Sequence, residues 1–166
     1  MRSDRENPDP ARPVPEVANL GIARPPLIYL GSIALGVILH FARPLSLLPR
    51  RVSLWLAAAV VLLAIGLFLF AVRTFRAAGT PVPGNRPTTT IVHAGPYRLS
   101  RNPIYLAFSL LQLGIALWTN SLWLGLTLLA ALALMSFVVI PREERYLEAR
   151  FPSEYSGYKA SVRRWL

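Results

Sequence analysis

The chain has 166 residues, of which 54% are hydrophobic and only 16% charged, whereas a soluble domain usually carries about 25% charged residues. Because it contains no cysteine, the sequence excludes disulfides, thiolate nucleophiles and cysteine-ligated metals. Its two histidines are too few for a histidine-rich metal centre, so no metal is expected. The net charge of +10 comes from basic residues that fall between apolar runs. This pattern indicates arginines facing anionic lipid headgroups rather than nucleic acid.

The chain begins with a polar stretch and then a short apolar run. Residues 1–24 are rich in proline, arginine and acidic residues, so we expect a disordered, solvated tail that is not a signal peptide. Residues 26–42 are apolar but slightly short for a transmembrane helix, which takes about 20 residues. The sequence therefore leaves open whether this run crosses the membrane completely. Its small residues would let another helix approach closely; they are Gly31, Ser32, Ala34 and Gly36.

Residues 53–72 form the clearest membrane span, with Trp55 near one interface and arginines beyond the other end. A loop rich in proline and glycine over residues 77–87 cannot continue this helix. Residues 88–92 are then expected to form a short extended piece that leads into the next part of the chain.

Residues 103–118 and 121–140 are the third and fourth apolar runs, and only Thr119-Asn120 separates them. So short a connection predicts an antiparallel helical hairpin. Pro141 is expected to end the last span at the membrane surface. Residues 142–166 begin with a polar, helix-prone stretch, and apolar or aromatic side chains then recur at spacings of three, four and three, at Tyr155, Tyr158, Val162 and Trp165. This spacing predicts a C-terminal amphipathic helix that lies on the headgroups or on the bundle.

These runs predict an all-α integral membrane protein, with about four transmembrane helices in a single domain over residues 25–166. Lysine and arginine number four in the tail, three in the first loop, five in the loop before the third run and six after the fourth, while the hairpin turn has none. The positive-inside rule then places the tail, the central loop and the C-terminal region in the cytoplasm. The expected location is an inner (plasma) membrane or the endoplasmic reticulum membrane, and the oligomeric state is not predicted.

The segment His93–Tyr105 is unusually polar for a connection between apolar helices. Its Gly-Pro and Asn-Pro pairs are turn signals that stiffen the backbone. Because the last two spans form a hairpin, Glu143-Glu144 returns to the same membrane face. We therefore expect a polar cluster at the cytoplasmic surface that comprises His93, Tyr97, Arg98, Arg101, Asn102, Tyr105, Glu143 and Glu144. In the alternative interpretation, the arginines only anchor helices at the headgroups and the glutamates pair with them.

Several separated motifs now resemble a known superfamily. They are His93-Ala94-Gly95-Pro96-Tyr97-Arg98, Arg101-Asn102-Pro103-Ile104-Tyr105, Glu143-Glu144 with Phe151, Tyr155 and Tyr158 downstream, and the preceding Thr80-Pro81-Val82-Pro83. In this order they resemble the isoprenylcysteine carboxyl methyltransferase and phospholipid methyltransferase superfamily over about residues 53–166. The resemblance implies an integral membrane enzyme that uses S-adenosylmethionine without a Rossmann domain. It also implies a cofactor pocket at the cytosolic ends of the last helices, beneath the C-terminal segment.

The resemblance assigns roles residue by residue. It implies a cofactor pocket made of His93, Gly95, Pro96, Tyr97, Arg101, Asn102, Pro103, Tyr105 and Glu144. Arg98 and Glu143 are the candidates for catalysis or for substrate binding. Many relatives have histidine at the position of Asn102. Asparagine does not titrate near neutral pH, so a proton shuttle at this position is not expected.

The chemistry of S-adenosylmethionine fits such a cluster, because its ammonium, sulfonium and carboxylate groups need both acidic and basic partners. We expect a lipophilic acceptor that enters from the bilayer. A carboxylate acceptor would need a cation, such as Arg98 or Arg142, whereas a phospholipid-like amine would need a base, such as a glutamate or His93. The sequence does not choose between these two acceptors. Two alternative hypotheses for the function are an NADPH-dependent membrane reductase of the sterol-reductase type and a membrane protein that is not an enzyme.

Overall fold

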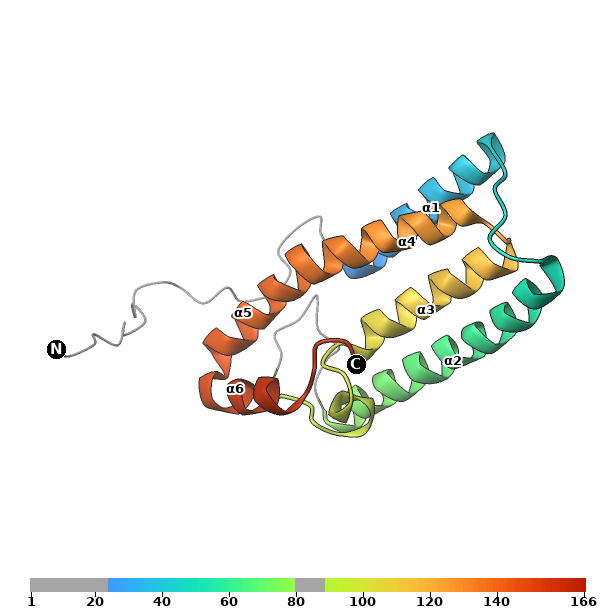
Figure 1. Cartoon of the computed structure of the whole chain (residues 1–166). Helices are drawn as coiled ribbons and strands as arrows, with labels where there is room; N and C mark the ends of the chain where they lie inside the picture. The colour runs from blue at the N-terminus through green and yellow to red at the C-terminus, as the bar shows by residue number, and fades with distance from the viewer. Residues whose placement is uncertain (1–23, 80–88) are drawn as a thin grey trace.

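The computed structural model describes residues 24–79 and 89–166, and every regular element in these two ranges is helical (Figure 1). The elements are α1 (Pro25–Ala42), α2 (Arg50–Ala77), the 3-10 helix η1 (Gly95–Arg98), α3 (Pro103–Trp118), α4 (Leu122–Leu134), the π-helix η2 (Met135–Val139), α5 (Ile140–Arg150) and α6 (Pro152–Ser161). The predicted all-α class is confirmed.

Some expectations fall wholly or partly outside the described ranges. The predicted tail, apart from Arg24, and the motif Thr80-Pro81-Val82-Pro83 lie there. The predicted extended piece is irregular where the structure describes it, over residues 89–92.

Within residues 24–79 and 89–166, three helical stretches are long and apolar enough to cross a membrane: α1, α2 and the stretch Leu122–Arg150. The helix α3 is apolar but shorter, with 16 residues, and it packs mainly against α2, while α4 packs mainly against α1. Large apolar side chains along α2 are exposed, among them Trp55 and Leu62, as expected for a surface that faces lipid. The predicted count of about four spans remains a prediction.

Pro141 does not end the last helix, contrary to the expectation. The helix runs without a break from Leu122 to Arg150 and includes the π-helical turn η2 just before the proline. There the Ile140 backbone N–H donates to the Met135 carbonyl, five residues earlier. A proline inside a helix removes one donor and its ring collides with the carbonyl four residues before it. The wider π turn accommodates both effects, so the helix continues past the proline.

The helices α1 and α4 approach closely at Gly36, one of the four small residues predicted to allow such an approach, whereas Gly31 has no described neighbour within 4 Å of an added Cβ. An added Cβ at Gly36 would lie 2.8 Å from both Leu124 Cδ2 and Thr127 Oγ1 of α4, so a larger residue would separate α1 from α4. Polar bonds also join the helices: the Tyr29 hydroxyl lies 2.7 Å from Ser109 Oγ of α3. Such bonds hold helices together where water is absent.

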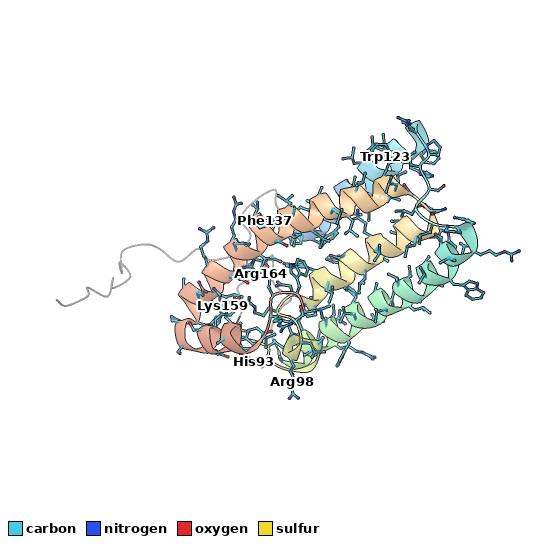
Figure 2. The ribbon with its side chains drawn as sticks, viewed as in Figure 1. His93, Arg98, Trp123, Phe137, Lys159 and Arg164 are labelled. Atoms are coloured by element: carbon cyan, nitrogen blue, oxygen red, sulfur yellow. The ribbon has the colours of Figure 1, made fainter. Side chains whose placement is uncertain are left out.

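The α3–α4 hairpin is closed at its turn and open at its other end (Figure 1). At the turn, Asn120 adopts a left-handed φ of 51°, and its Oδ1 accepts hydrogen bonds of 3.0 Å from the backbone N–H groups of Leu47 and Leu48. Trp123 lies at this closed end, while His93 and Arg98 lie at the open end (Figure 2). The two polar segments that the sequence singles out therefore meet at the open end of the hairpin.

Residues 142–166 do not form one helix. The helix α5 ends at Phe151, which leaves the helical region with φ −133° and ψ 63°, and α6 follows as a separate helix of 10 residues. The backbone is extended at Val162, so Val162 and Trp165 lie beyond α6. Tyr158 of α6 donates a 2.7 Å hydrogen bond to the Tyr97 carbonyl of η1. This break folds α6 back across the open end of the bundle (Figure 1).

Candidate active site

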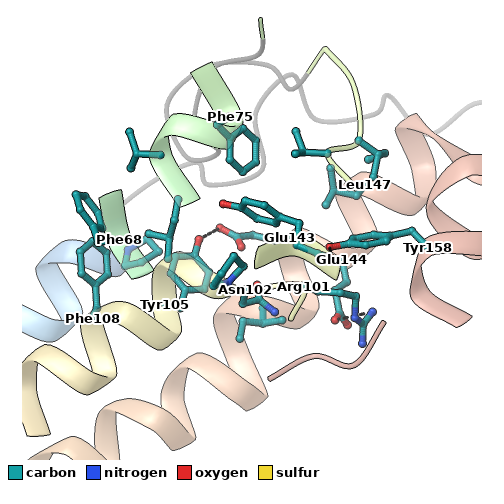
Figure 3. A pocket seen from close by; sticks show the side chains of 18 of the residues that line it. Phe68, Phe75, Arg101, Asn102, Tyr105, Phe108, Glu143, Glu144, Leu147 and Tyr158 are labelled. Carbon is teal, nitrogen blue, oxygen red and sulfur yellow. Dashed lines mark hydrogen bonds and ion pairs between the residues drawn. The ribbon is translucent and has the colours of Figure 1, made fainter. Parts of the chain in front are cut away.

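A cavity of about 560 Å³ occupies the open end of the bundle (Figure 3). Seven elements contribute to it: the start of α1, α2, the segment before η1, η1 itself, the start of α3, α5 and α6. Its apolar wall includes Leu27, Phe68, Val72, Phe75, Ile91, Ile104, Phe108, Ile140 and Leu147, and its polar wall includes Arg24, Tyr97, Arg101, Asn102, Tyr105, Glu143, Glu144, Tyr155 and Tyr158. The cavity thus combines buried ionisable groups with aromatic and aliphatic side chains.

Glu143 is buried, and its carboxylate is held by a phenol from α3. The Tyr105 hydroxyl donates a 2.6 Å hydrogen bond to Glu143 Oε1 (Figure 3). Both residues are less than one tenth exposed, and they are 38 positions apart in sequence. A carboxylate out of water needs hydrogen-bond donors to remain ionised. The contact also orients the carboxyl group within the cavity wall.

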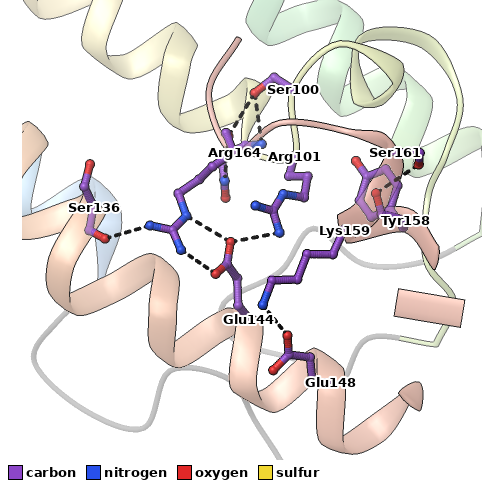
Figure 4. A network of polar contacts seen from close by, with 10 residues as sticks. Ser100, Arg101, Ser136, Glu144, Glu148, Tyr158, Lys159, Ser161 and Arg164 are labelled. Atoms are coloured by element: carbon purple, nitrogen blue, oxygen red, sulfur yellow. Dashed lines mark hydrogen bonds and ion pairs between the residues drawn. The ribbon is translucent and has the colours of Figure 1, made fainter. Parts of the chain in front are cut away.

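Glu144 lies between two arginines (Figure 4). Arg101 Nη1 is 3.1 Å from Oε1, and Arg164 donates to both oxygens, from Nε at 3.1 Å and from Nη2 at 2.7 Å. Bidentate arginine–carboxylate pairs of this kind are strong and fix the plane of the carboxylate. The three side chains together carry a net charge of +1, so the cluster is suited to hold an anionic group.

The segment Arg163–Trp165 runs beside the turn that carries Arg101. The Arg101 backbone N–H donates to the Arg163 carbonyl at 2.9 Å. Asn102 Nδ2 donates to the Arg164 carbonyl at 3.0 Å, and Trp165 Nε1 donates to Ser136 Oγ at 3.2 Å. Asn102 therefore reaches the cavity wall with its amide nitrogen already bonded to this segment.

Three tyrosines surround the arginine side of the cavity. Burial raises the pKa of the Tyr97 and Tyr158 hydroxyls well above 10. Burial, together with the nearby Glu144 carboxylate, raises the pKa of Tyr155 to about 12. These phenols are therefore neutral at physiological pH and can donate hydrogen bonds.

Three buried polar atoms of the cavity wall lack a hydrogen-bond partner among the described residues, namely the Tyr97 hydroxyl, Arg101 Nε and Arg101 Nη1. Arg101 Nη1 lies 3.1 Å from Glu144 Oε1 as an ion pair, which leaves the other two atoms without a partner of either kind. Both residues line the cavity. Buried polar atoms are nearly always hydrogen-bonded, and an unbonded one at a cavity points to a ligand. Two donors beside a cluster of net charge +1 fit a carboxylate, and a buried glutamate close by fits a cation.

The structure brings most, but not all, of the predicted site residues together. Those that line the cavity are Tyr97, Arg101, Asn102, Pro103, Tyr105, Glu143 and Glu144. Those that do not are His93, Gly95, Pro96 and Arg98. Arg98 is exposed and its side chain projects away from the bundle (Figure 2). His93 is about half exposed, with its Nε2 3.5 Å from Glu154 Oε1.

Gly95 and Pro96 shape the loop instead of lining the cavity. Gly95 has a φ of +57°, and an added Cβ would lie 2.8 Å from Thr74 Oγ1 and 3.2 Å from Phe70 Cζ. Pro96 is buried within η1. The two residues therefore dock η1 on α2, which presents Tyr97 to the cavity.

Sequence reasoning missed two parts of the site. Arg164 contacts Glu144 although it lies 20 positions away, and no spacing in the sequence links the two. The second part, the apolar wall that α2 contributes, could have been found from the sequence. Phe68, Val72 and Phe75 have a spacing of four and three residues and so share one helix face. That face points toward the cavity. Among the described residues, no group of three or more His, Asp or Glu side chains could hold a metal ion.

Comparison with known proteins gives a family and several relatives. The chain is 41% identical over 73 residues to the cobalt-zinc-cadmium resistance protein CzcN of Cupriavidus metallidurans, covering 44% of this chain and 33% of that protein. It is 36% identical over 73 residues to the nickel-cobalt-cadmium resistance protein NccN of Alcaligenes xylosoxydans xylosoxydans, covering 44% and 34%. It is 45% identical over 65 residues to an uncharacterized protein of Haemophilus influenzae, covering 38% of this chain and all of that protein.

The chain thus spans about a third of the length of the two metal-resistance proteins. No solved structure matches it. The family model described as phospholipid methyltransferase matches residues 52–154, which is more than half of the chain and includes α2, the polar loop, the hairpin and α5. The predicted superfamily is confirmed: the chain belongs to the phospholipid methyltransferase family.

Proposed function

We propose that this protein transfers a methyl group from S-adenosylmethionine to a lipophilic acceptor in the membrane. One observation carries the proposal: a single cavity joins a buried ionic cluster to an apolar wall built by helices α1, α2 and α3. Two of these helices are long and apolar enough to cross a membrane. A charged cofactor can therefore enter the cavity from water, and an apolar acceptor can enter the same cavity from the lipid bilayer.

The residues that would hold the cofactor follow from the geometry. Arg101 Nε and the Tyr97 hydroxyl are free to donate to its carboxylate, since both are buried without a partner in the described part of the chain. Glu143 would balance its cationic groups. When bound, the cofactor supplies an electrophilic methyl group. Methyl transfer is a displacement reaction, and its rate depends most on the positioning of the reactants and on the exclusion of water. The aromatic wall and the buried phenols would position the reactants and exclude water.

The cavity contains a suitable residue for each of the two acceptors, an amine and a carboxylate. Glu143, held by Tyr105, would serve as the base for an amine. Arg24, at the start of α1, also lines the cavity and would hold a carboxylate. Arg98 and Arg142, the cations expected from the sequence, are both exposed and absent from the lining. We also infer from the distribution of arginines that the cavity opens to the cytoplasm.

Cofactor binding tests the proposal first. Full-length protein in lipid nanodiscs is titrated calorimetrically with S-adenosylhomocysteine and, separately, with NADPH. We expect micromolar binding of S-adenosylhomocysteine that Glu144→Gln weakens at least tenfold. Glu148→Gln is the matched control, because Glu148 lies one turn further along α5 and forms only an exposed pair with Lys159. Binding of NADPH without S-adenosylhomocysteine would refute the proposal and support a reductase.

Methyl transfer tests it second. The nanodiscs are incubated with a lipid extract and S-adenosylmethionine that carries a radiolabelled methyl group. We expect label in the organic phase, and label in water-soluble products alone would contradict a lipophilic acceptor. Base treatment then separates the chemistries, since it releases labelled methanol from a methyl ester but leaves a methylated amine intact.

A further inference from the structure

The segment Arg163–Trp165 lies beyond the region that the family model matches, which ends at residue 154. It contributes no residue to the cavity lining, yet it is bonded to three parts of the site. Its backbone accepts hydrogen bonds from Arg101 and Asn102. Its Trp165 is bonded to Ser136 in η2. These bonds hold the segment against the turn that carries Arg101 and against η2.

Within this segment, Arg164 controls the geometry of Glu144. Glu144 is the less exposed partner, with 7% of its side chain exposed against 35% for Arg164. Arg164 contacts both carboxylate oxygens, whereas Arg101 approaches only Oε1. A planar guanidinium bonded to both oxygens fixes the orientation of a carboxylate, which a single contact does not do. Glu144 in turn holds the end of the Arg101 side chain, which lines the cavity and whose Nε is buried without a hydrogen-bond partner among the described residues.

Arg164 also sets the charge of the cluster. With Glu144 and two arginines ionised the cluster carries +1, and without Arg164 it would carry zero. A neutral pair has little attraction for an anion, whereas a cluster of net charge +1 out of water attracts one strongly.

We propose that Arg164 is a positioning residue that makes Arg101 and Glu144 selective for the carboxylate of the cofactor. This inference rests on the proposed function. Arg164 acts through Glu144 and touches no ligand itself. Its loss therefore weakens binding of a ligand that carries the carboxylate and spares a ligand that lacks it.

The test compares S-adenosylmethionine with decarboxylated S-adenosylmethionine, which differ only in the carboxylate, by calorimetric titration of the full chain in nanodiscs. We expect Arg164→Ala to weaken binding of the first ligand about tenfold, the effect typical of losing a hydrogen bond to a charged group. The affinity for the second ligand should stay within about twofold. Arg163→Ala is the matched control, since Arg163 is exposed and contributes only its carbonyl.

Arg164→Lys distinguishes the effect of the charge from the effect of the bidentate contact. It also replaces Arg164→Ala in the test if that variant does not fold. Lysine keeps the charge but lacks the planar pair of nitrogen donors that fixes the carboxylate plane, so we expect a smaller loss that is again confined to the carboxylate ligand. Equal loss for both ligands, or no loss for either, would overturn the inference and leave the proposed function standing. Failure of the wild-type protein to bind either ligand would overturn the proposed function itself.

Discussion

Replacing Gly95 by alanine tests whether this glycine shapes the loop or contacts the cofactor. Gly95 adopts a φ of +57°, where an L-residue costs about 1 to 2 kcal/mol. The new Cβ would also lie 2.8 Å from Thr74 Oγ1, which is held in place by its own 2.8 Å hydrogen bond to the Phe70 carbonyl. Such overpacking typically costs a further ~1 to 3 kcal/mol. We therefore expect a total loss of about 2 to 5 kcal/mol.

Gly79→Ala is the matched control, because Gly79 has a similar φ of +66° but no atom of the described residues lies within 4 Å of the added Cβ. It should cost only the backbone penalty of about 1 to 2 kcal/mol. The assay is thermal unfolding of both variants in the same detergent, where 1 kcal/mol shifts the midpoint by roughly 2 to 4 °C for a chain of this size. Equal midpoints for the two variants would refute the packing argument.

The same variant distinguishes the structural role from the cofactor role that the family resemblance implies. If Gly95 only docks η1 on α2, any loss of S-adenosylhomocysteine affinity in Gly95→Ala should accompany a loss of thermal stability, because a displaced η1 also moves Tyr97. A loss of affinity without a loss of thermal stability would show instead that Gly95 approaches the cofactor.

Two further predictions concern the phenols. Tyr105→Phe removes the donor to Glu143 and should lower methyl transfer into lipid about tenfold or more. Tyr29→Phe, which loses contacts within the helix bundle, should leave transfer unchanged, and equal effects of the two variants would contradict the role given to Glu143. For Tyr155, the folded-state pKa of about 12 lies above the ordinary value of 10.0, so the unfolded chain releases its proton first and stability falls as pH rises from 10 toward 12. Thermal midpoints across this range should therefore decline less steeply for Tyr155→Phe, and an unchanged decline would contradict the assigned cause.

The sequence predicted the helices and the pairing of the two polar segments because both depend on local signals. Long apolar runs without charge specify helices in lipid, and the connection Thr119-Asn120 is too short for anything except a hairpin. From that hairpin alone, Glu143 was expected beside the segment that carries Tyr105, and the two are hydrogen-bonded. This part of the site follows from topology.

Other parts depend on tertiary contacts that carry no local signal. Arg98 and Arg101 are equally polar in sequence, and the docking of η1 on α2 through Gly95 exposes the first and buries the second. In the sequence Pro141 predicts the end of the last span, whereas in the structure the π turn before it lets the helix continue. Arg164 reaches Glu144 because the chain breaks at Phe151 and folds back. In each case a neighbouring element decides the outcome.

The pair Glu143-Glu144 shows how these tertiary features combine. Adjacent residues on an α-helix point about 100° apart, so burying both carboxylates requires neighbours over a wide arc of α5. Both are nevertheless buried, because α3 encloses one side of α5 through Tyr105 and the returning chain encloses the other through Arg164. The first carboxylate has a neutral partner in Tyr105, whereas the second is more than neutralised by its two arginines. Two identical neighbours thus have different partners among their described contacts, a phenol for Glu143 and two arginines for Glu144.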